Sequence, residues 1–467
     1  MHSLRSLATR LRAALLLIGA LVALPALPAL AALVQVQKTL PSDFNVDPPL
    51  AVPDERFGDA VAMHGNWMAV GAPSLQANGG SVSIFERVGG SWQWRQTLTA
   101  PTPQTGSGFG SDVDLYEVAG LLTVIVGAPQ WDGAQVNQGR VYVYSDTDVA
   151  PAGFSFSIAT IDAPLPEAEG RFGAAVAVYG DLAAIGEPNN GITGNGAVSL
   201  RGRSVGGSNA WGVIGSAKTG DPGSAFGSSV DLSGEYVIVG APYANNAAGL
   251  RTGLAYVYRQ DLGGSNAFGL KHTLSPATAE SGMGFGHSVA IWDANPGAAD
   301  SLSRSLVGAP LTDNAGFADV GAVVFYGDGT VNFTHNHVGN ANNVNAHHGY
   351  SVALDGDNAL VGRPSQIVST LASVGQVNTY AYNGSVWATN TINLAETGGG
   401  TGHRFGKSVA VAGLLAVASS PGTRVVQTQR AGALTSLNKP SVTWQIDTAA
   451  SPVLAQADLP SLSSDQQ

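Results

Sequence analysis

The sequence predicts an all-β protein, a seven-bladed β-propeller of four-stranded antiparallel blades. A Phe-Gly pair, a Val four residues after the Phe and a Gly-Ala-Pro triplet recur seven times along the 467 residues, with the triplet intact in four copies and altered in three. Successive copies start 52 to 63 residues apart, a period typical of propeller blades rather than of stacked helical repeats. Charged residues make up only 12% of the chain and Gly numbers 61, which suits short strands joined by glycine turns.

The Phe-Gly pair marks the start of each repeat, and His replaces the Phe in the sixth copy. The seven pairs are Phe57-Gly58, Phe109-Gly110, Phe172-Gly173, Phe226-Gly227, Phe285-Gly286, His348-Gly349 and Phe405-Gly406. The Ala of the triplet is replaced by Glu187 in the third repeat and by Arg363 in the sixth. We interpret these two replacements as variation at the loop mouths.

Each repeat begins with a strand in which Val and another apolar residue alternate with small or acidic residues, as in Val230-Asp231-Leu232. This period-2 pattern gives the strand one apolar face and one face of small side chains. Small side chains suit an innermost strand, because seven blades crowd toward one axis. Asp112, Asp114 and Asp231 lie on this face and are therefore expected to line an axial channel.

Three further strands complete the expected blade. The second follows a tight Gly turn and ends at Gly-Ala-Pro, because Pro cannot donate to the ladder. The third opens with Gly, and the fourth carries aromatic residues and Thr. The expected fourth strands span residues 92–99, 211–218, 268–274, 387–394 and 442–448. Residues 34–40 look like another fourth strand, so either the N-terminal or the C-terminal segment closes the last blade.

The termini define the remaining segments. Residues 1–31 read as a signal peptide, with Arg5, Arg10 and Arg12 before a short apolar run and a small-residue cleavage site at its end. We expect residues 32–52 to contain the N-terminal strand that can close the ring. We expect residues 53–450 to form the propeller and residues 451–467 to form a flexible tail. The predicted location is secreted, periplasmic or on the cell surface.

Composition argues against several partners. Loss of the leader removes three arginines and no acids, which changes the formal net charge from −11 to −14. A nucleic-acid partner is not expected without a basic face. The chain has no Cys, so disulfides do not staple it. No second long apolar stretch follows the leader, so no membrane span is expected after signal removal.

The recurring Phe-Gly and Gly-Ala-Pro motifs resemble the FG-GAP repeat, which is known from the propeller head of integrin α-subunits and from bacterial exported proteins. The resemblance covers residues 53–448. It implies a propeller that binds other molecules through its loops, usually without catalysis, and it suggests a role in cell adhesion.

The resemblance also raises calcium as a cofactor, since the family often holds this ion in the turn between the first two strands. That turn must be long, because calcium takes six to eight oxygens. In five of the seven repeats this segment has room only for a tight turn. In repeat number five the segment is longer and contains Asp293, Asn295, Gly297 and Asp300, one residue short of the family pattern. We therefore expect no cofactor, with calcium in the fifth repeat as the alternative.

Two constellations could carry other chemistry. Zinc could be bound by the histidines His335, His337, His347 and His348, but no Cys and no positioned carboxylate completes a tetrahedral ligand set. We therefore expect these histidines to lie on a solvated outer strand and in a loop. The channel carboxylates could act as acid and base on a polysaccharide at the channel mouth. We expect them instead to be tolerated by a water-filled channel, because perturbed pKa values, rather than presence alone, mark catalysis.

Binding is expected on the loops between second and third strands, which share one face with the connections between blades. These segments vary in length and carry polar residues with an occasional aromatic. The candidate residues are Trp131, Asp132, Asn189, Asn190, Tyr243, Asn245, Asn246, Asp313 and Asn314. The sequence thus predicts an exported, non-catalytic adhesion module that recognises protein or carbohydrate. The alternatives are an enzyme at the channel mouth and a structural cell-surface protein.

Overall fold

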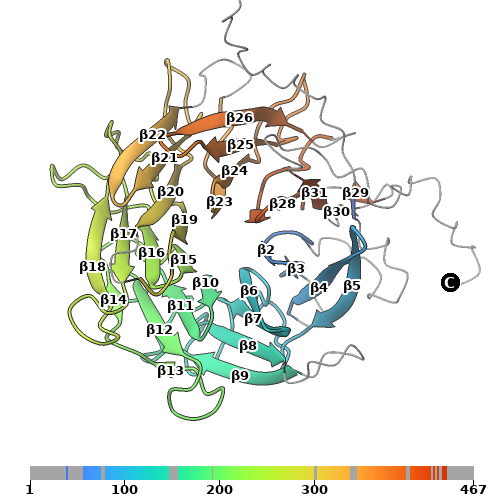
Figure 1. Cartoon of the computed structure of the whole chain (residues 1–467), viewed down its shortest axis with the longest axis vertical. Coiled ribbons are helices and arrows are strands. Elements are labelled where there is room, and N and C mark those ends of the chain that lie inside the picture. Colours follow the sequence, from blue (N-terminus) through green and yellow to red (C-terminus); the bar gives the residue numbers. More distant parts are fainter. Residues whose placement is uncertain are drawn as a thin grey trace, which may run out of the picture. The chain divides into compact units, whose positions relative to one another are not determined.

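The computed structural model describes residues 38–39, 56–74, 79–146, 156–191, 193–298, 302–336, 344–395, 400–421, 424–425, 429–430 and 434–438. The predicted signal peptide, the C-terminal tail and the expected strand at 442–448 lie outside these ranges. The described elements are all strands (Figure 1). Among the described residues no helix is long and apolar enough to cross a membrane.

Six sheets consist of strands that follow one another in the sequence, and they are complete antiparallel blades. The first three contain β2 (Val61–His64), β3 (Trp67–Ala72), β4 (Ser81–Val88) and β5 (Ser91–Leu98); β6 (Val113–Val118), β7 (Leu121–Ala128), β8 (Arg140–Asp146) and β9 (Phe156–Asp162); and β10 (Ala175–Tyr179), β11 (Leu182–Glu187), β12 (Ala197–Gly202), β13 (Gly212–Val213) and β14 (Lys218–Thr219). The next three contain β15 (Ser229–Ser233), β16 (Tyr236–Ala241), β17 (Leu254–Arg259) and β18 (Gly269–Leu274); β19 (Ser288–Asp293), β20 (Ser303–Ala309), β21 (Ala322–Gly327) and β22 (Thr330–Asn336); and β23 (Ser351–Asp355), β24 (Asn358–Arg363), β25 (Gln376–Tyr382) and β26 (Trp387–Leu394).

The seventh repeat is built differently, so the prediction of seven like blades is met for six. Its β27 (Val409–Ala412) and β28 (Leu415–Ser419) share a sheet with β31 (Leu434–Asn438) and the N-terminal β1 (Lys38–Thr39). The outer strand of this sheet is β1, which pairs antiparallel with β31. A separate two-stranded ribbon joins β29 (Arg424–Val425) and β30 (Gln429–Arg430). Strand β27 contacts β23 on one side and β2 on the other.

One expected fourth strand was wrong in detail. The segment 211–218 does not form a continuous strand but divides into β13 and β14, which pair with opposite ends of β12. Gly215 lies between them with φ +63°, a conformation that an extended strand does not adopt. The expected strands at 92–99, 268–274 and 387–394 are found within one residue as β5, β18 and β26.

The two glycines of the motif form the seam between neighbouring blades. The N–H of Gly110 donates to the carbonyl of Gly127 in its own repeat at 2.9 Å. A Cβ on Gly127 would lie only 2.0 Å from the carbonyl oxygen of Gly173, which begins the next repeat. The same steric conflict between an added Cβ and the next repeat's Gly carbonyl occurs at six seams, including this one. The motif therefore recurs because each blade stacks its backbone directly on the next.

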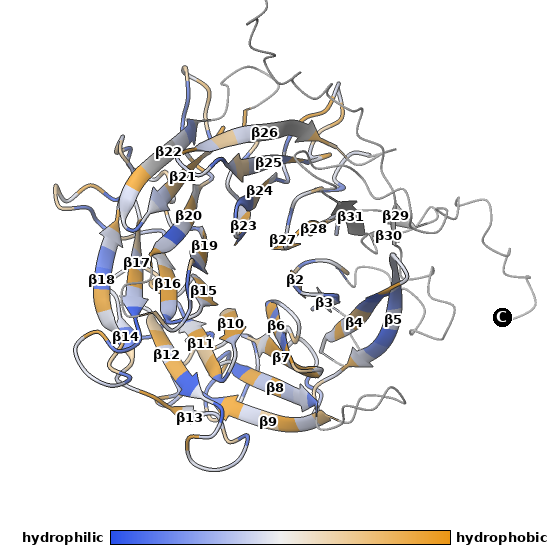
Figure 2. Cartoon of the chain, in the orientation of Figure 1, coloured by the Kyte–Doolittle hydropathy of each residue, from blue (hydrophilic) through white to orange (hydrophobic). Residues whose placement is uncertain are grey.

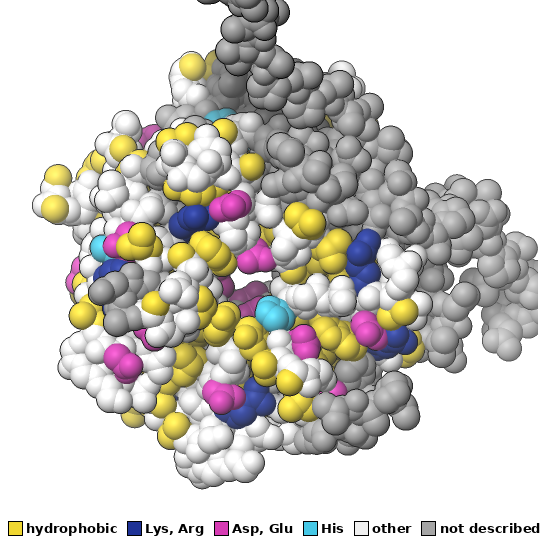
Figure 3. Space-filling view, viewed as in Figure 1, with side chains coloured by type: hydrophobic (Ala, Val, Ile, Leu, Met, Phe, Trp, Pro, Cys, Tyr) yellow, Lys and Arg dark blue, Asp and Glu magenta, His cyan; other side chains and the backbone are white. Residues whose placement is uncertain are grey.

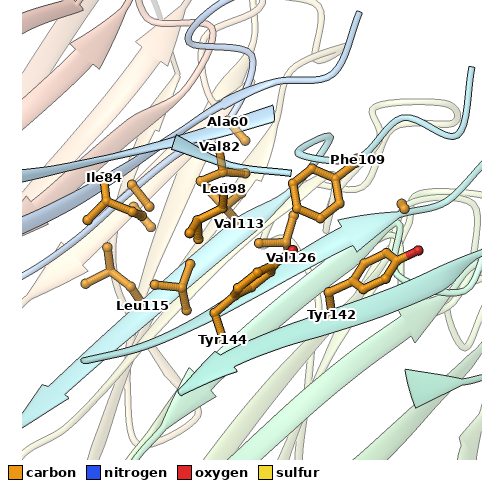
Figure 4. Close-up of a cluster of buried hydrophobic side chains, with 14 of the residues drawn as sticks. Ala60, Val82, Ile84, Leu98, Phe109, Val113, Leu115, Val126, Tyr142 and Tyr144 are labelled. Carbon is orange, nitrogen blue, oxygen red and sulfur yellow. The ribbon is translucent and has the colours of Figure 1, made fainter. Parts of the chain in front are cut away.

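The Phe of the motif fills the space between blades. Phe109 is fully buried and packs edge-on against Tyr142 and Tyr144, with ring centroids 5.4 and 6.3 Å apart. Val82 and Leu98 of the preceding blade close the same cluster, as Figure 4 shows. In Figure 2 the outer strands β5 and β18 carry hydrophilic stretches, whereas β10 and β11 are largely hydrophobic. Burial between blades thus supplies the main stabilisation.

Candidate functional site

The binding residues predicted from the sequence all lie in segments between second and third strands. Trp131 and Asp132 follow β7, and Asn189 and Asn190 follow β11. Tyr243, Asn245 and Asn246 follow β16, and Asp313 and Asn314 follow β20. Because the connections between blades run to the same ends of the strands, both sets of segments share one side of the propeller. We call this side the loop face.

Hydrogen bonds across a blade boundary hold the loop after β7. The N–H of Asp132 donates to Oε1 of Gln104 at 2.6 Å, and Nε2 of Gln104 donates to the carbonyl of Asp132 at 3.1 Å. Gln104 belongs to the connection from the first blade. The guanidinium of Arg140 lies 3.4 Å from the centroid of the Trp131 ring, which fixes the plane of this aromatic side chain.

The loops after β7 and β11 meet around the connection that joins their blades. Nδ2 of Asn137 donates to Oε1 of Glu169 at 2.9 Å, and Nδ2 of Asn189 donates to the carbonyl of Glu169 at 3.0 Å. A hollow of about 640 Å³ lies among them, with Gln135, Glu167 and Asn189 in its wall. The structure therefore brings these two predicted loops together around one polar concavity.

The loops after β16 and β20 are supported by other contacts. The Arg251 guanidinium lies 4.7 Å from the Tyr243 ring centroid. Oδ1 of Asn246 accepts hydrogen bonds from two N–H groups of its own loop. The N–H of Asp313 donates to Oε2 of Glu280 at 3.0 Å, and the Asn314 and Phe317 backbones form a short bridge. The side chain of Asn245 is exposed.

The interpretation of Glu187 and Arg363 as loop-mouth variation was wrong, because both side chains are buried. Glu187 is 3% exposed, and Oε2 accepts a hydrogen bond from Nδ2 of Asn190 at 3.0 Å. Burial raises the pKa of its carboxyl to about 7. Arg363 is 1% exposed and donates to Oε1 of Gln376 at 2.7 Å. The sequence did contain a sign of this burial, because in both repeats a charged residue replaces the Ala that follows the seam glycine.

A cavity of about 850 Å³ runs along the axis, lined by the first strand of every repeat. The prediction that Asp112, Asp114 and Asp231 line it is confirmed. Figure 3 shows the central opening, with acidic side chains and a histidine at its rim.

The three carboxylates join neighbouring innermost strands. Oδ2 of Asp114 accepts the N–H of Val178 at 2.7 Å, and Oδ1 accepts the N–H of Leu115 at 2.8 Å. Asp231 repeats this arrangement, with Oδ2 accepting the N–H of Ile291 at 2.7 Å. Asp112 likewise accepts the N–H of Val176 across the boundary. Each side chain therefore links the first strand of one blade to that of the next.

Burial in the channel wall shifts the acid–base equilibria of these groups. Loss of hydration raises the pKa of Asp112 and of Asp231 to about 7, although backbone N–H donors oppose the shift. The pKa of Asp114 is raised well above its usual value by the same cause, with the Asp231 charge adding to it. Perturbed carboxyls in a cavity can serve catalysis, but structural hydrogen bonding perturbs them too.

His335 lies on the outer strand β22 and His348 takes the buried place of the motif Phe, as expected, but neither His335 nor His347 is fully solvated. His348 is fully buried, and its Nε2 lies 2.9 Å from the hydroxyl of Tyr380. Nδ1 of His335 lies 2.6 Å from the same hydroxyl. His337 lies outside the described residues. Two histidines and a tyrosine thus link the fifth and sixth blades, because β22 and β25 supply His335 and Tyr380.

Asp293 of the calcium alternative lies at the end of β19 and is 2% exposed. Its Oδ1 accepts the N–H of Asn295 at 3.0 Å. Asp300 lies outside the described residues. Within the described ranges, no three His, Cys, Asp or Glu side chains are grouped so that they could hold a metal ion.

The fold and the seam define a β-propeller built from repeats that carry paired glycine motifs. A family model of the FG-GAP repeat matches residues 216–258, which include Phe226-Gly227 and Gly240-Ala241-Pro242. The chain is an FG-GAP repeat propeller protein. The search of curated proteins found no match.

Proposed function

We propose that this protein is exported and acts as a non-catalytic binding or adhesion module, recognising protein or carbohydrate through its loop face. The observation that carries the proposal is the concavity bounded by the loops after β7 and β11. Its wall offers carboxylate and amide groups held by hydrogen bonds across blade boundaries. Fixed polar groups around a hollow lower the entropy lost when a ligand binds.

The first experiment is a glycan and protein array probed with the purified chain, with and without calcium. A specific ligand is expected, and its affinity is then measured by calorimetry. Asn189→Ala and Asp132→Ala should each weaken binding about tenfold, as truncation of central interface residues does. Asp181→Ala is the control, because this carboxylate is 78% exposed and lies in the turn between β10 and β11, on the side opposite the loop face. Undiminished binding by both loop variants would refute the loop face as the site.

Export rests on residues 1–31 and is tested separately. Expression in a bacterial host with intact secretion should yield a processed chain beginning at Ala32, identified by mass spectrometry. Recovery of unprocessed chain from the cytoplasm alone would contradict export while leaving the binding proposal untouched.

We also propose that the sheet β27-β28-β31-β1 serves as the seventh blade. Support comes from the contacts of β27 with both β23 and β2, and from the pairing of Thr39 with Leu434. Closing a ring removes exposed sheet edges. Thr39→Pro should lower the melting temperature by breaking this pairing, whereas an unchanged melting curve would contradict the proposal.

An enzyme acting on polysaccharide is the second candidate, favoured by the raised pKa values of Asp112, Asp114 and Asp231. Against it, each carboxylate already accepts hydrogen bonds from strand N–H groups. Reducing-end release from a polysaccharide panel, abolished by Asp231→Asn in a folded variant, would favour the enzyme over the binding module.

A further inference from the structure

The end of the channel opposite the loop face has a composition of its own. Each first strand runs from the Phe-Gly pair toward its turn with the second strand. The residue seven positions after the motif Phe, or after His348, therefore lies near that turn. These residues are His64, Tyr116, Tyr179, Ser233, Trp292, Asp355 and Ala412, and all seven line the channel. Four of the seven positions carry an aromatic ring.

Three of these rings are contiguous. The His64 and Tyr116 ring centroids lie 4.4 Å apart, and those of Tyr116 and Tyr179 lie 4.7 Å apart. The rings come from three successive blades, so they form an arc along one side of the opening. All three side chains are half-buried, which leaves part of each ring accessible from the channel.

Charge at this end favours a cation. Trp292 comes from the fifth blade and Asp355 from the sixth. Burial is the main cause that raises the pKa of Tyr179, and the charges of Asp293 and Asp355 contribute to the shift. Of the five Asp residues that line the channel, Asp293 and Asp355 lie at this end, and none of the described lining residues is Lys or Arg. Burial lowers the pKa of His64, so its imidazole is neutral at pH 7.

One positive charge does approach the opening. The Arg304 guanidinium lies 4.8 Å from the Trp292 ring centroid. It is paired with Asp357, with Nη1 and Oδ1 2.6 Å apart, so its charge is compensated locally. The guanidinium thus already serves as the cationic partner of the Trp292 ring.

We propose that His64, Tyr116, Tyr179, Trp292 and Asp355, here called the aromatic mouth, bind a small quaternary ammonium compound. Aromatic faces attract cations through their quadrupole, and methyl groups on the nitrogen bury against the rings. A primary ammonium fits less well, since it is strongly hydrated and needs several acceptors. Asp293 and Asp355 supply carboxylates at this level of the channel. The site is distinct from the loop face and does not depend on the function proposed there.

The test compares choline with 3,3-dimethylbutan-1-ol, which has the same shape without the charge, by calorimetry on the full chain. Saturable choline binding at least tenfold tighter than that of the neutral alcohol is expected. Absence of saturable choline binding, or equal binding of the two compounds, overturns the proposal. This comparison uses the unaltered protein, so it does not depend on whether a variant folds.

Variants then locate the site. Tyr179→Leu removes the ring and should weaken choline binding about five- to twentyfold, whereas Tyr179→Phe keeps the ring and should retain most of it. Asp355→Asn should weaken it as well. Asp221→Asn is the control, because it removes an exposed carboxylate that does not line the channel. Equal loss in Asp355→Asn and Asp221→Asn, or no loss in Tyr179→Leu, would overturn the assignment.

Discussion

Substitution of the seam glycine in the fifth repeat tests the reason why the motif recurs. In Gly308→Ala the added Cβ would lie 2.0 Å from the carbonyl oxygen of Gly349 and 2.4 Å from Oγ of Ser288, whereas ordinary contact begins at 3.4 Å. The first neighbour is backbone of the next blade, so relief requires the two blades to separate. Overpacking of this kind costs about 3 kcal/mol or more.

The backbone of Gly308 gives the opposite expectation. Its φ is not in the left-handed region, so Ala is conformationally acceptable there. Replacing such a glycine stabilises a protein by about 0.4–1 kcal/mol when space allows, because the unfolded chain loses freedom. Gly327 in the same blade is the matched control, because it has an equally permissive backbone and nothing within 4 Å of an added Cβ. Gly327→Ala should therefore be neutral or slightly stabilising.

The assay is urea denaturation followed by tryptophan fluorescence, with the midpoint and slope of each variant compared. Gly308→Ala should be less stable than Gly327→Ala by roughly 4 kcal/mol, the sum of the two effects. Equal stability of the two variants would refute the view that backbone contact between blades requires glycine. A reduced slope in Gly308→Ala would indicate that the blades no longer unfold together.

Three further perturbations test the links between blades. Burial raises the pKa of Asp231 to about 7 in the folded state, so this group favours folding at low pH and its contribution declines as pH rises toward 7. The free energy of unfolding of the wild type should therefore exceed that of Asp231→Asn by an amount that shrinks between about pH 4 and pH 7. A difference that grows over this range would contradict the direction of the pKa shift. Tyr380→Phe removes the hydroxyl that is hydrogen-bonded to His335 and His348, and should lower the free energy of unfolding by about 1–3 kcal/mol. Tyr382→Phe, on a half-buried ring, is the control and should change the free energy of unfolding by less than half of that. Ser408→Ala removes the acceptor for the Val61 N–H between the seventh and first repeats, at an expected cost of about 1 kcal/mol and with faster hydrogen exchange of that amide; unchanged exchange would argue against this contact.

Much of the fold followed from local pattern. The recurrence of Phe-Gly and Gly-Ala-Pro predicted the blades, and the period-2 face predicted that Asp112, Asp114 and Asp231 would line the channel. These predictions succeeded because strand periodicity and glycine geometry depend on residues close together in the sequence. The place of the loops after β7 and β11 on one face followed in the same way from strand order.

Only the tertiary structure decided how residues from different repeats meet. The sequence left open which terminal strand closes the last sheet, and the pairing of β1 with β31 is a contact between segments nearly 400 residues apart. The burial of Glu187 and Arg363 depends on neighbouring blades that a single repeat does not contain. The same is true of the arc of His64, Tyr116 and Tyr179, whose members are more than 50 residues apart. Such contacts are set by the rotation from blade to blade, a property of the assembled ring that no local run of residues encodes.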